Sequence, residues 1–194
     1  MGIREEQKEQ RRQDILEAGL ELFVAKGYAG TKITDIADRV SMSTGLLFHY
    51  FESKEKLYEE LVKTGLQGTR YPAQMECSSA IGFFEGFARQ LLMYIKEQPV
   101  AAKMFSLMAQ AQRSEGIPEH IKQMAEQVDT IEQFVPIILR GQEEGTVREG
   151  DALALSNVFW CSVQGIMEQF AVRPEIPLPE PEWIVDIVRK AKEC

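Results

Sequence analysis

The sequence predicts an all-α fold, and three observations support this prediction. Apolar residues recur every three or four positions along most of the 194 residues, which is the spacing of one helix face. Several of these segments follow a serine, threonine or aspartate, whose side chain can accept a free backbone N–H at a helix start. No stretch alternates apolar and polar residues as a half-buried strand does. We therefore expect helices joined by short loops.

Four helices are expected in the first third of the chain. Their bounds are about residues 5–26, 35–40, 44–51 and 54–67. Gly27 ends the first helix, because glycine readily adopts the left-handed conformation found at helix ends. The other three helices begin at side chains that can accept a backbone N–H. These capping residues are Thr34, Ser43 and Ser53.

The remainder of the chain should form five helices separated by breaks that contain glycine or proline. Their bounds are about residues 78–98, 99–113, 119–144, 151–172 and 183–192. Pro136 falls inside the third of these and is expected to kink it, since proline removes one N–H and clashes with the preceding turn. The stretch RPEIPLPEPE stands before the last helix, and its four prolines exclude regular structure there.

Composition and charge exclude several classes of protein. No apolar run approaches the roughly 20 residues that cross a bilayer, and the charged N-terminal residues do not resemble a secretion signal. We therefore expect a cytoplasmic protein with no membrane partner. The formal net charge is -8, with 10 basic and 12 acidic residues among the first 65 and 12 and 18 in the rest. A surface for nucleic acid would therefore lie in the first part of the chain.

The stretch SMSTGLLFHYF, residues 41–51, combines small polar residues with four consecutive rings. The helices on either side of its turn have helix-turn-helix spacing, in which the second helix enters the DNA major groove. Ser43, Thr44 and Gly45 would let the backbone approach DNA, while Leu47 would pack inward. The same spacing also fits an ordinary packed helix pair, so spacing alone leaves both interpretations open.

The order of residues between positions 15 and 61 resembles the N-terminal DNA-binding domain of the tetracycline-repressor (TetR) family of bacterial transcriptional regulators. The resemblance rests on short motifs: Leu22-Phe23, Lys26-Gly27-Tyr28, Thr31, Thr34, Ile36-Ala37, Ser43-x-Gly45, Tyr50-Phe51 and Ser53-Lys54-Glu55-x-Leu57. It implies a three-helix DNA-binding domain, residues 1–54, followed by a larger helical domain for ligand binding and dimerisation, residues 55–194. The second domain matches the family in length and helicity alone.

The resemblance also implies a set of DNA contacts. Thr34 and Tyr50 would contact phosphates, and Lys54 would hold the DNA backbone. The residues on or against base edges would be Ser43, Thr44, Gly45, Leu46 and His49. Ser41 stands where the family commonly has glycine, so the turn would place a serine in a less comfortable conformation. Phe48 stands where tyrosine is frequent; it cannot donate to a phosphate, but its ring can contact a thymine methyl group.

The second domain is expected to hold a small effector among its helices, because methionine and aromatic side chains line adaptable apolar pockets. Most of these side chains will simply form the core. The candidate ligand-binding residues are Phe87, Tyr94, Met104, Phe105, Met108, Met124, Phe134, Phe159 and Gln164, with Gln110, Gln133 and Asn157 as further polar candidates. A neutral or cationic, mostly apolar effector is expected, since few cations are available to pair with a buried anion.

In the family, the last two helices form the dimer interface, so we expect a homodimer through residues 151–172 and 183–192. Ala154, Ser162 and Gly165 are small enough for close helix approach. The plain alternative is that these residues pack inside one chain. The three cysteines are widely spaced, and no group of residues has the spacing of a metal site. No cofactor and no catalytic residues are expected.

The sequence thus predicts a ligand-responsive transcriptional regulator, most often a repressor in this family, that binds a palindromic double-stranded DNA operator and is released by a small apolar effector. The alternative is a small-molecule binding protein that has lost specific DNA binding, which Ser41, Phe48 and the net negative first part would favour. An enzyme is a more distant alternative, because no acid–base or nucleophile pattern is visible.

Overall fold

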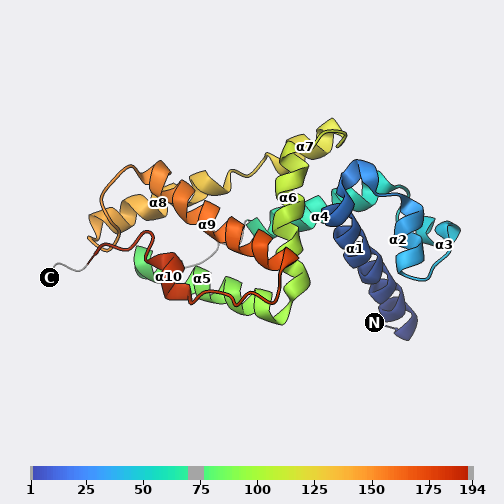
Figure 1. Ribbon diagram of the computed structural model, residues 1–194, viewed down its shortest axis with the longest axis horizontal. Coiled ribbons are helices and arrows are strands. Elements are labelled where there is room, and N and C mark those ends of the chain that lie inside the picture. The colour runs from blue at the N-terminus through green and yellow to red at the C-terminus, as the bar shows by residue number, and fades with distance from the viewer. Residues whose placement is uncertain (1, 70–76, 192–194) are drawn as a thin grey trace. The chain divides into compact units, whose positions relative to one another are not determined.

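The computed structural model describes residues 2–69 and 77–191, and their regular structure is helical (Figure 1). The helices are α1 Ile3–Gly30, α2 Ile33–Arg39, α3 Thr44–Phe48, α4 Lys54–Thr69, α5 Ala80–Glu97, the 3-10 turn η2 Pro99–Ala101, α6 Ala102–Arg113, α7 Glu119–Ala125, α8 Thr130–Glu143, α9 Ala152–Val172 and α10 Pro181–Val185. Within the described ranges, β-pairing is limited to an isolated antiparallel bridge between Val147 and Arg189. The predicted all-α class is confirmed.

The chain divides into two compact units. One comprises Met1–Leu66 with Lys103–Gln127, and the other comprises Gln67–Ala102 with Val128–Cys194. The first unit therefore joins α6 and α7 to the helices of the N-terminal segment. The functional division between residues 54 and 55 remains a prediction.

The core of the first unit is built around three rings from α1 and α4. Tyr58 is completely buried and meets Phe23 edge to face at 4.8 Å and Tyr28 at 4.9 Å between ring centroids. Gly27 breaks the helical backbone of α1 with φ 73° and ψ 167°, so the predicted end of the first helix is confirmed as a break at that residue. Ile36 and Leu47 are fully buried and anchor α2 and α3 on this core.

The second unit has an aromatic core contributed by α5, α8 and α9. Phe134 of α8 lies 6.0 Å from Phe84 and 5.3 Å from Phe159 between ring centroids, and the three residues are fully buried. The hydroxyl of the buried Ser156 donates to the carbonyl of Ile131, which ties α9 to the start of α8. Apolar burial together with stacked and edge-to-face ring contacts therefore stabilises this unit.

Most of the predicted helix caps are confirmed. The hydroxyl of Ser43 accepts the N–H of Leu46 at 3.2 Å, and that of Ser53 accepts the N–H of Lys56 at 3.1 Å. Asp151, at the start of another predicted helix, caps α9 in the same way. The predicted Thr34 cap is wrong, because Lys32 occupies the cap position of α2 and Thr34 lies within its first turn.

The long helix predicted over residues 119–144 is wrong, since two helices, α7 and α8, take its place. The carboxylate of Asp129 accepts the N–H groups of Ile131 and Glu132 and so starts a new helix there. The interruption precedes Pro136, which lies inside α8.

Two other helices end earlier than predicted. Helix α3, the helix expected to enter the DNA major groove, ends at Phe48 and not at residue 51 as predicted. The last helix, expected over residues 183–192, spans only Pro181–Val185. Beyond it, Lys190 donates its backbone N–H to Thr146 while Arg148 donates to Val188, so pairing with a distant segment replaces further helical turns.

Candidate nucleic-acid interface

The turn that joins α2 to α3 holds Ser41 in the left-handed region, with φ 53°. Among the described residues it is the sole non-glycine with positive φ, which confirms the less comfortable conformation expected there. Such a conformation costs a non-glycine residue about 1 kcal/mol. The next residue, Met42, is buried and donates its N–H to the carbonyl of Ala37 at 2.9 Å. Met42 therefore anchors a strained turn and sets the angle at which α3 leaves α2.

Helix α3 presents an unusual outer face. Leu47 points into the core, while Leu46 and Phe48 are 44% and 45% exposed. Gly45 and His49 are exposed as well, and a Cβ atom built on Gly45 would meet nothing within 4 Å. Packing within the chain therefore does not explain these residue types. A short helix with small residues at its start and exposed apolar side chains beyond them suits a surface that meets another molecule.

The remaining predicted DNA contacts flank this helix. Thr34 is exposed near the start of α2, Thr44 is half-buried at the start of α3, and Tyr50 is half-buried just after α3. Tyr50 lines a shallow surface hollow of about 280 Å³ together with Arg12, Phe51, Glu52 and side chains of α4. All these residues belong to the first unit.

Lys54 has a role in the fold that the sequence did not reveal. Its Nζ donates to the carbonyl oxygens of Tyr28 and Thr31 at 2.8 and 3.0 Å and lies 4.2 Å from the centre of the Tyr28 ring. Partial loss of hydration lowers the pKa of this ammonium group. The hydroxyl of Thr31 in turn donates to the carbonyl of Gly27. Lys54 thus ties the connector between α1 and α2 to the start of α4.

Two other cations of α1 and α2, Lys26 and Arg39, are paired inside the first unit. Lys26 lies 2.9 Å from a carboxylate oxygen of Asp35. Arg39 lies 2.6 Å from the carboxylate of Glu21, and Lys103 forms a second ion pair with the same carboxylate. These partners leave less positive charge for phosphates than a count of lysines and arginines suggests.

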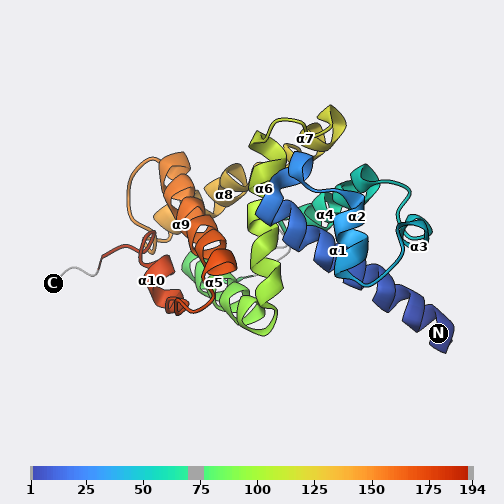
Figure 2. The ribbon, with the colours of Figure 1, turned by 45° about the vertical axis from the view of Figure 1, so that its right-hand side comes forward.

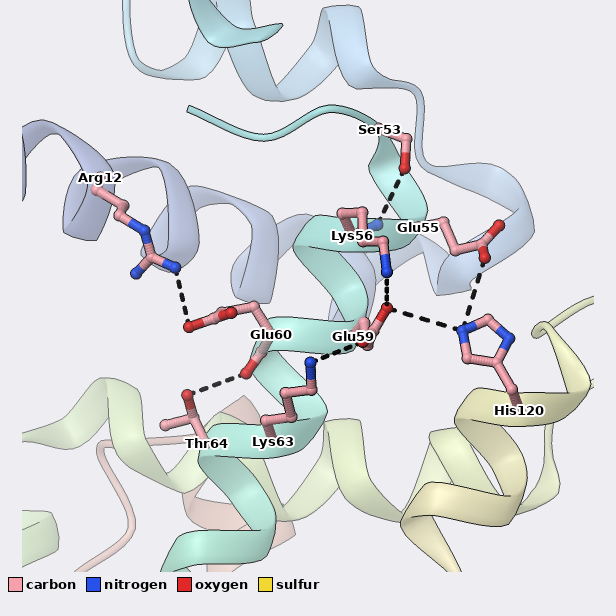
Figure 3. A network of polar contacts seen from close by, with 9 residues as sticks. All are labelled: Arg12, Ser53, Glu55, Lys56, Glu59, Glu60, Lys63, Thr64 and His120. Carbon is pink, nitrogen blue, oxygen red and sulfur yellow. Dashed lines mark hydrogen bonds and ion pairs between the residues drawn. The ribbon is translucent and has the colours of Figure 1, made fainter. Parts of the chain in front are cut away.

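Glu59 of α4 sits at the centre of a polar network that the sequence did not reveal (Figure 3). Its carboxylate accepts Lys56 Nζ at 2.8 Å and Lys63 Nζ at 2.7 Å. These hydrogen bonds lower the pKa of Glu59 from the ordinary 4.5 to about 2, against the opposing effect of burial. His120 of α7 reaches into the same network, with Nε2 3.6 Å from Glu55 and 3.7 Å from Glu59. Lys56 and Lys63 stand one turn before and one turn after Glu59 on the same helix, and this spacing in the sequence could have predicted the network.

The network makes stability depend on pH in a definite direction. Because the folded-state pKa of Glu59 lies below its ordinary value, the ionised carboxylate stabilises the fold above about pH 4.5, and this contribution is lost as the pH falls towards 2. We predict that Glu59→Gln lowers the free energy of unfolding at pH 7 by about 0.5–1 kcal/mol and flattens its decline below pH 4.5. Urea unfolding at pH 7, 4.5 and 3 measures both effects.

Glu60→Gln is the matched control for this experiment, since Glu60 lies next along α4 and has Arg12 as its ion-pair partner instead. Equal pH profiles for the two variants would contradict the assignment of the effect to Glu59.

The predicted effector residues fall in both units. Phe87, Phe134 and Phe159 are buried and in mutual ring contact within the second unit. Tyr94 of that unit is 55% exposed, and Gln164 donates to Glu168 on its own helix. Met104, Phe105, Met108 and Met124 belong to the first unit.

Two buried amide oxygens among the polar candidates have no hydrogen-bond partner within residues 2–69 and 77–191. They belong to Gln110 in the first unit and Gln133 in the second. Buried acceptors of this kind are costly unless a donor reaches them.

The predicted dimer helix α9 carries an exposed apolar and small-residue face. Leu153, Val158 and Val172 are exposed along α9, as are Ala154, Cys161 and Gly165, and Trp183 is exposed on α10. A Cβ atom at Gly165 would meet nothing within 4 Å of the same chain. Packing inside one chain therefore does not require glycine at this position.

The described residues include no group of three or more His, Cys, Asp or Glu side chains placed to hold a metal ion. None of the described helices combines the length and the hydropathy of a membrane-spanning segment.

Comparison with known proteins gives a consistent result. The family profile described as bacterial regulatory proteins of the tetR family matches residues 15–61. An uncharacterised helix-turn-helix transcriptional regulator of Bacillus subtilis, YfiR, is 23% identical over 171 residues, which span 86% of this chain and 82% of that protein. The transcriptional repressor KstR2 of Rhodococcus jostii is 36% identical over 56 residues, 29% of this chain and 28% of its own length.

Among solved structures, the fold is similar to that of the regulator MbdR from Azoarcus sp. CIB. The TM-score is 0.75 at 20% identity, over 91% of this chain and 96% of that one. This likeness extends over both units, whereas the family profile is limited to the helices around the helix-turn-helix.

Proposed function

Because the chain belongs to the tetR family of bacterial transcriptional regulators, we propose that it is a ligand-responsive repressor that binds a palindromic operator as a homodimer. The observation that carries this proposal is the outer face of α3. Gly45, Leu46 and Phe48 are exposed there although no packing among the described residues requires those residue types. DNA in the major groove is the partner that such a face fits.

The position of each residue supports the DNA contact proposed for it. Thr44 and Gly45 stand at the start of α3, where small residues allow the backbone to approach base edges. Leu46 and Phe48 can contact thymine methyl groups, and His49 can reach a base or a phosphate. Tyr50 and Thr34 carry hydroxyl groups for phosphates, which position the protein but carry no sequence code. Lys54 has donated two of its three N–H groups to carbonyls, so it contributes one further donor at most.

The proposed effector is a neutral or cationic, mostly apolar molecule with at least one hydrogen-bond donor. The buried and unpartnered oxygen of Gln133 would accept that donor, and a donor there would remove the cost of an unsatisfied group. An apolar effector would enter among the buried rings of Phe87, Phe134 and Phe159 of the same unit and replace some of their mutual contacts. An effector that favours one dimer geometry over another would release the DNA through its differential affinity for the two states.

Two substitutions distinguish residues that recognise DNA bases from residues that contact phosphates. Tyr50→Phe removes only a hydroxyl and should weaken binding to every DNA sequence by about tenfold per protomer, the value of one hydrogen bond to a charged group. Thr44→Ala should instead change which bases are preferred at one position of each half-site. Mobility-shift titrations at a stated salt concentration, on duplexes selected from a random pool, measure both.

Thr64→Ala serves as the control, because Thr64 is exposed on α4 and its hydroxyl donates to the carbonyl of Glu60 within that helix. If selection from the random pool enriches no sequence, the proposed function fails. An unchanged base preference in Thr44→Ala would contradict the placement of α3 in the groove.

The second candidate function is a small-molecule binding protein that no longer reads DNA specifically. The strained Ser41 turn and the internal pairing of Lys26 and Arg39 favour it. The same selection experiment decides between the two functions, because this candidate predicts no enrichment of any sequence.

A further inference from the structure

The first three turns of α1 separate their charges onto two sides. Arg4, Lys8 and Arg11 follow one another at spacings of four and three residues, so at 100° per residue they lie within a sector of about 60°. Glu5, Glu6 and Glu9 lie on the other side of the helix. These turns extend past α2 and α3 (Figure 2), and the side chains of both sets are exposed. We call Arg4, Lys8 and Arg11 the basic stripe.

The basic stripe has no partners within the described part of the chain. No ion pair or side-chain hydrogen bond involves Arg4, Lys8 or Arg11, whereas the other cations of α1 to α4 are engaged. The engaged cations are Arg12 with Glu60, Lys26 with Asp35, Arg39 with Glu21, Lys54 with two carbonyls, and Lys56 and Lys63 with Glu59. Lys32, between α1 and α2, stands close to Asp35, whose pKa is lowered chiefly by the Lys26 hydrogen bond and slightly by the Lys32 charge.

The direction of the basic stripe follows from its neighbours on α1, Arg12, which lies about 40° outside the sector of the stripe, and Ile15. Arg12 lies 2.9 Å from Glu60 of α4 and 5.1 Å from the centre of the Phe51 ring. Phe51 follows Tyr50, a proposed phosphate contact. The fully buried Ile15 lies in the same sector of α1. The basic stripe therefore lies on the side of α1 against which α4 and the segment after α3 pack.

We infer that the basic stripe binds phosphates of the DNA duplex beyond the base pairs that α3 contacts, an inference that rests on the proposed function. A chain of net charge -8 repels DNA at long range, so tight binding needs local cations that are not already neutralised. The stripe supplies three of them per protomer on an exposed helix that extends past α3. Contacts of this kind add affinity and salt dependence without adding sequence preference.

The test compares full-length chains that carry three neutral substitutions each. The stripe variant is Arg4→Gln with Lys8→Gln and Arg11→Gln, which keeps good helix formers in α1. The matched control is Lys96→Gln with Arg113→Gln and Lys190→Gln, three exposed cations outside α1 to α4. Both variants change the net charge by the same amount. Affinity is measured between 50 and 300 mM salt, roughly the range in which counterion release is resolved, for a selected duplex and a scrambled duplex of equal length.

The expected result is a log–log salt slope that is shallower by about 2.7 per protomer in the stripe variant, since each phosphate contact contributes about 0.9. Affinity should fall by the same factor on the selected and the scrambled duplex, and the control should keep the slope of the unmodified chain. A stripe variant whose slope equals that of the control would overturn the inference while leaving the proposed function intact. Absence of any selected sequence for the unmodified chain would overturn both.

Discussion

Phe134→Ala is expected to lower the free energy of unfolding by about 3–5 kcal/mol, the range for removing a buried phenylalanine side chain. Phe134 is fully buried in the second unit, and its ring meets those of Phe83, Phe87 and Phe159 at 6.1, 5.4 and 5.3 Å between centroids. The substitution removes apolar area and leaves a cavity that the surrounding rings cannot fill without losing their own contacts. A loss of this size is a large part of the 5–15 kcal/mol that stabilises a typical domain.

Leu139→Ala on the same helix is the matched control. Leu139 is 49% exposed, so its truncation should cost less than about 1 kcal/mol. Chemical unfolding followed by circular dichroism compares the two variants. A cost below about 1.5 kcal/mol for Phe134→Ala would show that the ring cluster is loosely packed, because tightly packed phenylalanines lose more.

Gly165→Glu is expected to convert the proposed dimer into a monomer, with a self-association constant weakened by at least about 100-fold, or nearly 3 kcal/mol. The expected cause is an unpaired charge buried between two copies of α9. Inside one chain the substitution should be harmless, since Gly165 is exposed and its Cβ position is open. Replacing a helical glycine even improves helix propensity. Loss of the dimer would therefore report on the interface and not on the fold of the monomer.

Gly68→Glu provides the control, because Gly68 is also a helical glycine, is exposed, and has an open Cβ position. Sedimentation velocity at micromolar concentration should find dimers for the unmodified chain and for Gly68→Glu, and monomers for Gly165→Glu. A monomeric unmodified chain would reject the proposed interface outright. A dimeric Gly165→Glu chain would move the interface away from this face of α9.

The helices could be predicted from the sequence because their determinants are local. The three- and four-residue spacing of apolar side chains, the Ser43 and Ser53 caps and the break at Gly27 each involve residues within a few positions of one another. The strain at Ser41 was predicted for the same reason, since a single backbone conformation decides it. The order of residues from 15 to 61 was also sufficient to indicate the family.

Contacts between distant segments could not be predicted, because they depend on how helices meet in space. Lys54, which is expected to contact DNA, also bonds carbonyls 23 and 26 positions earlier. The last helix was cut short by backbone pairing with residues 146–148.

His120 faces two carboxylates of α4, a contact that its place in the sequence does not indicate. The charges of α1 show the same limit: their spacing on the helix was visible in the sequence, but the packing around Glu59, Glu21 and Asp35 decided which cations stayed unpaired. A charge retains its full attraction for a phosphate only when no nearby carboxylate neutralises it, and that neutralisation is a property of the folded chain.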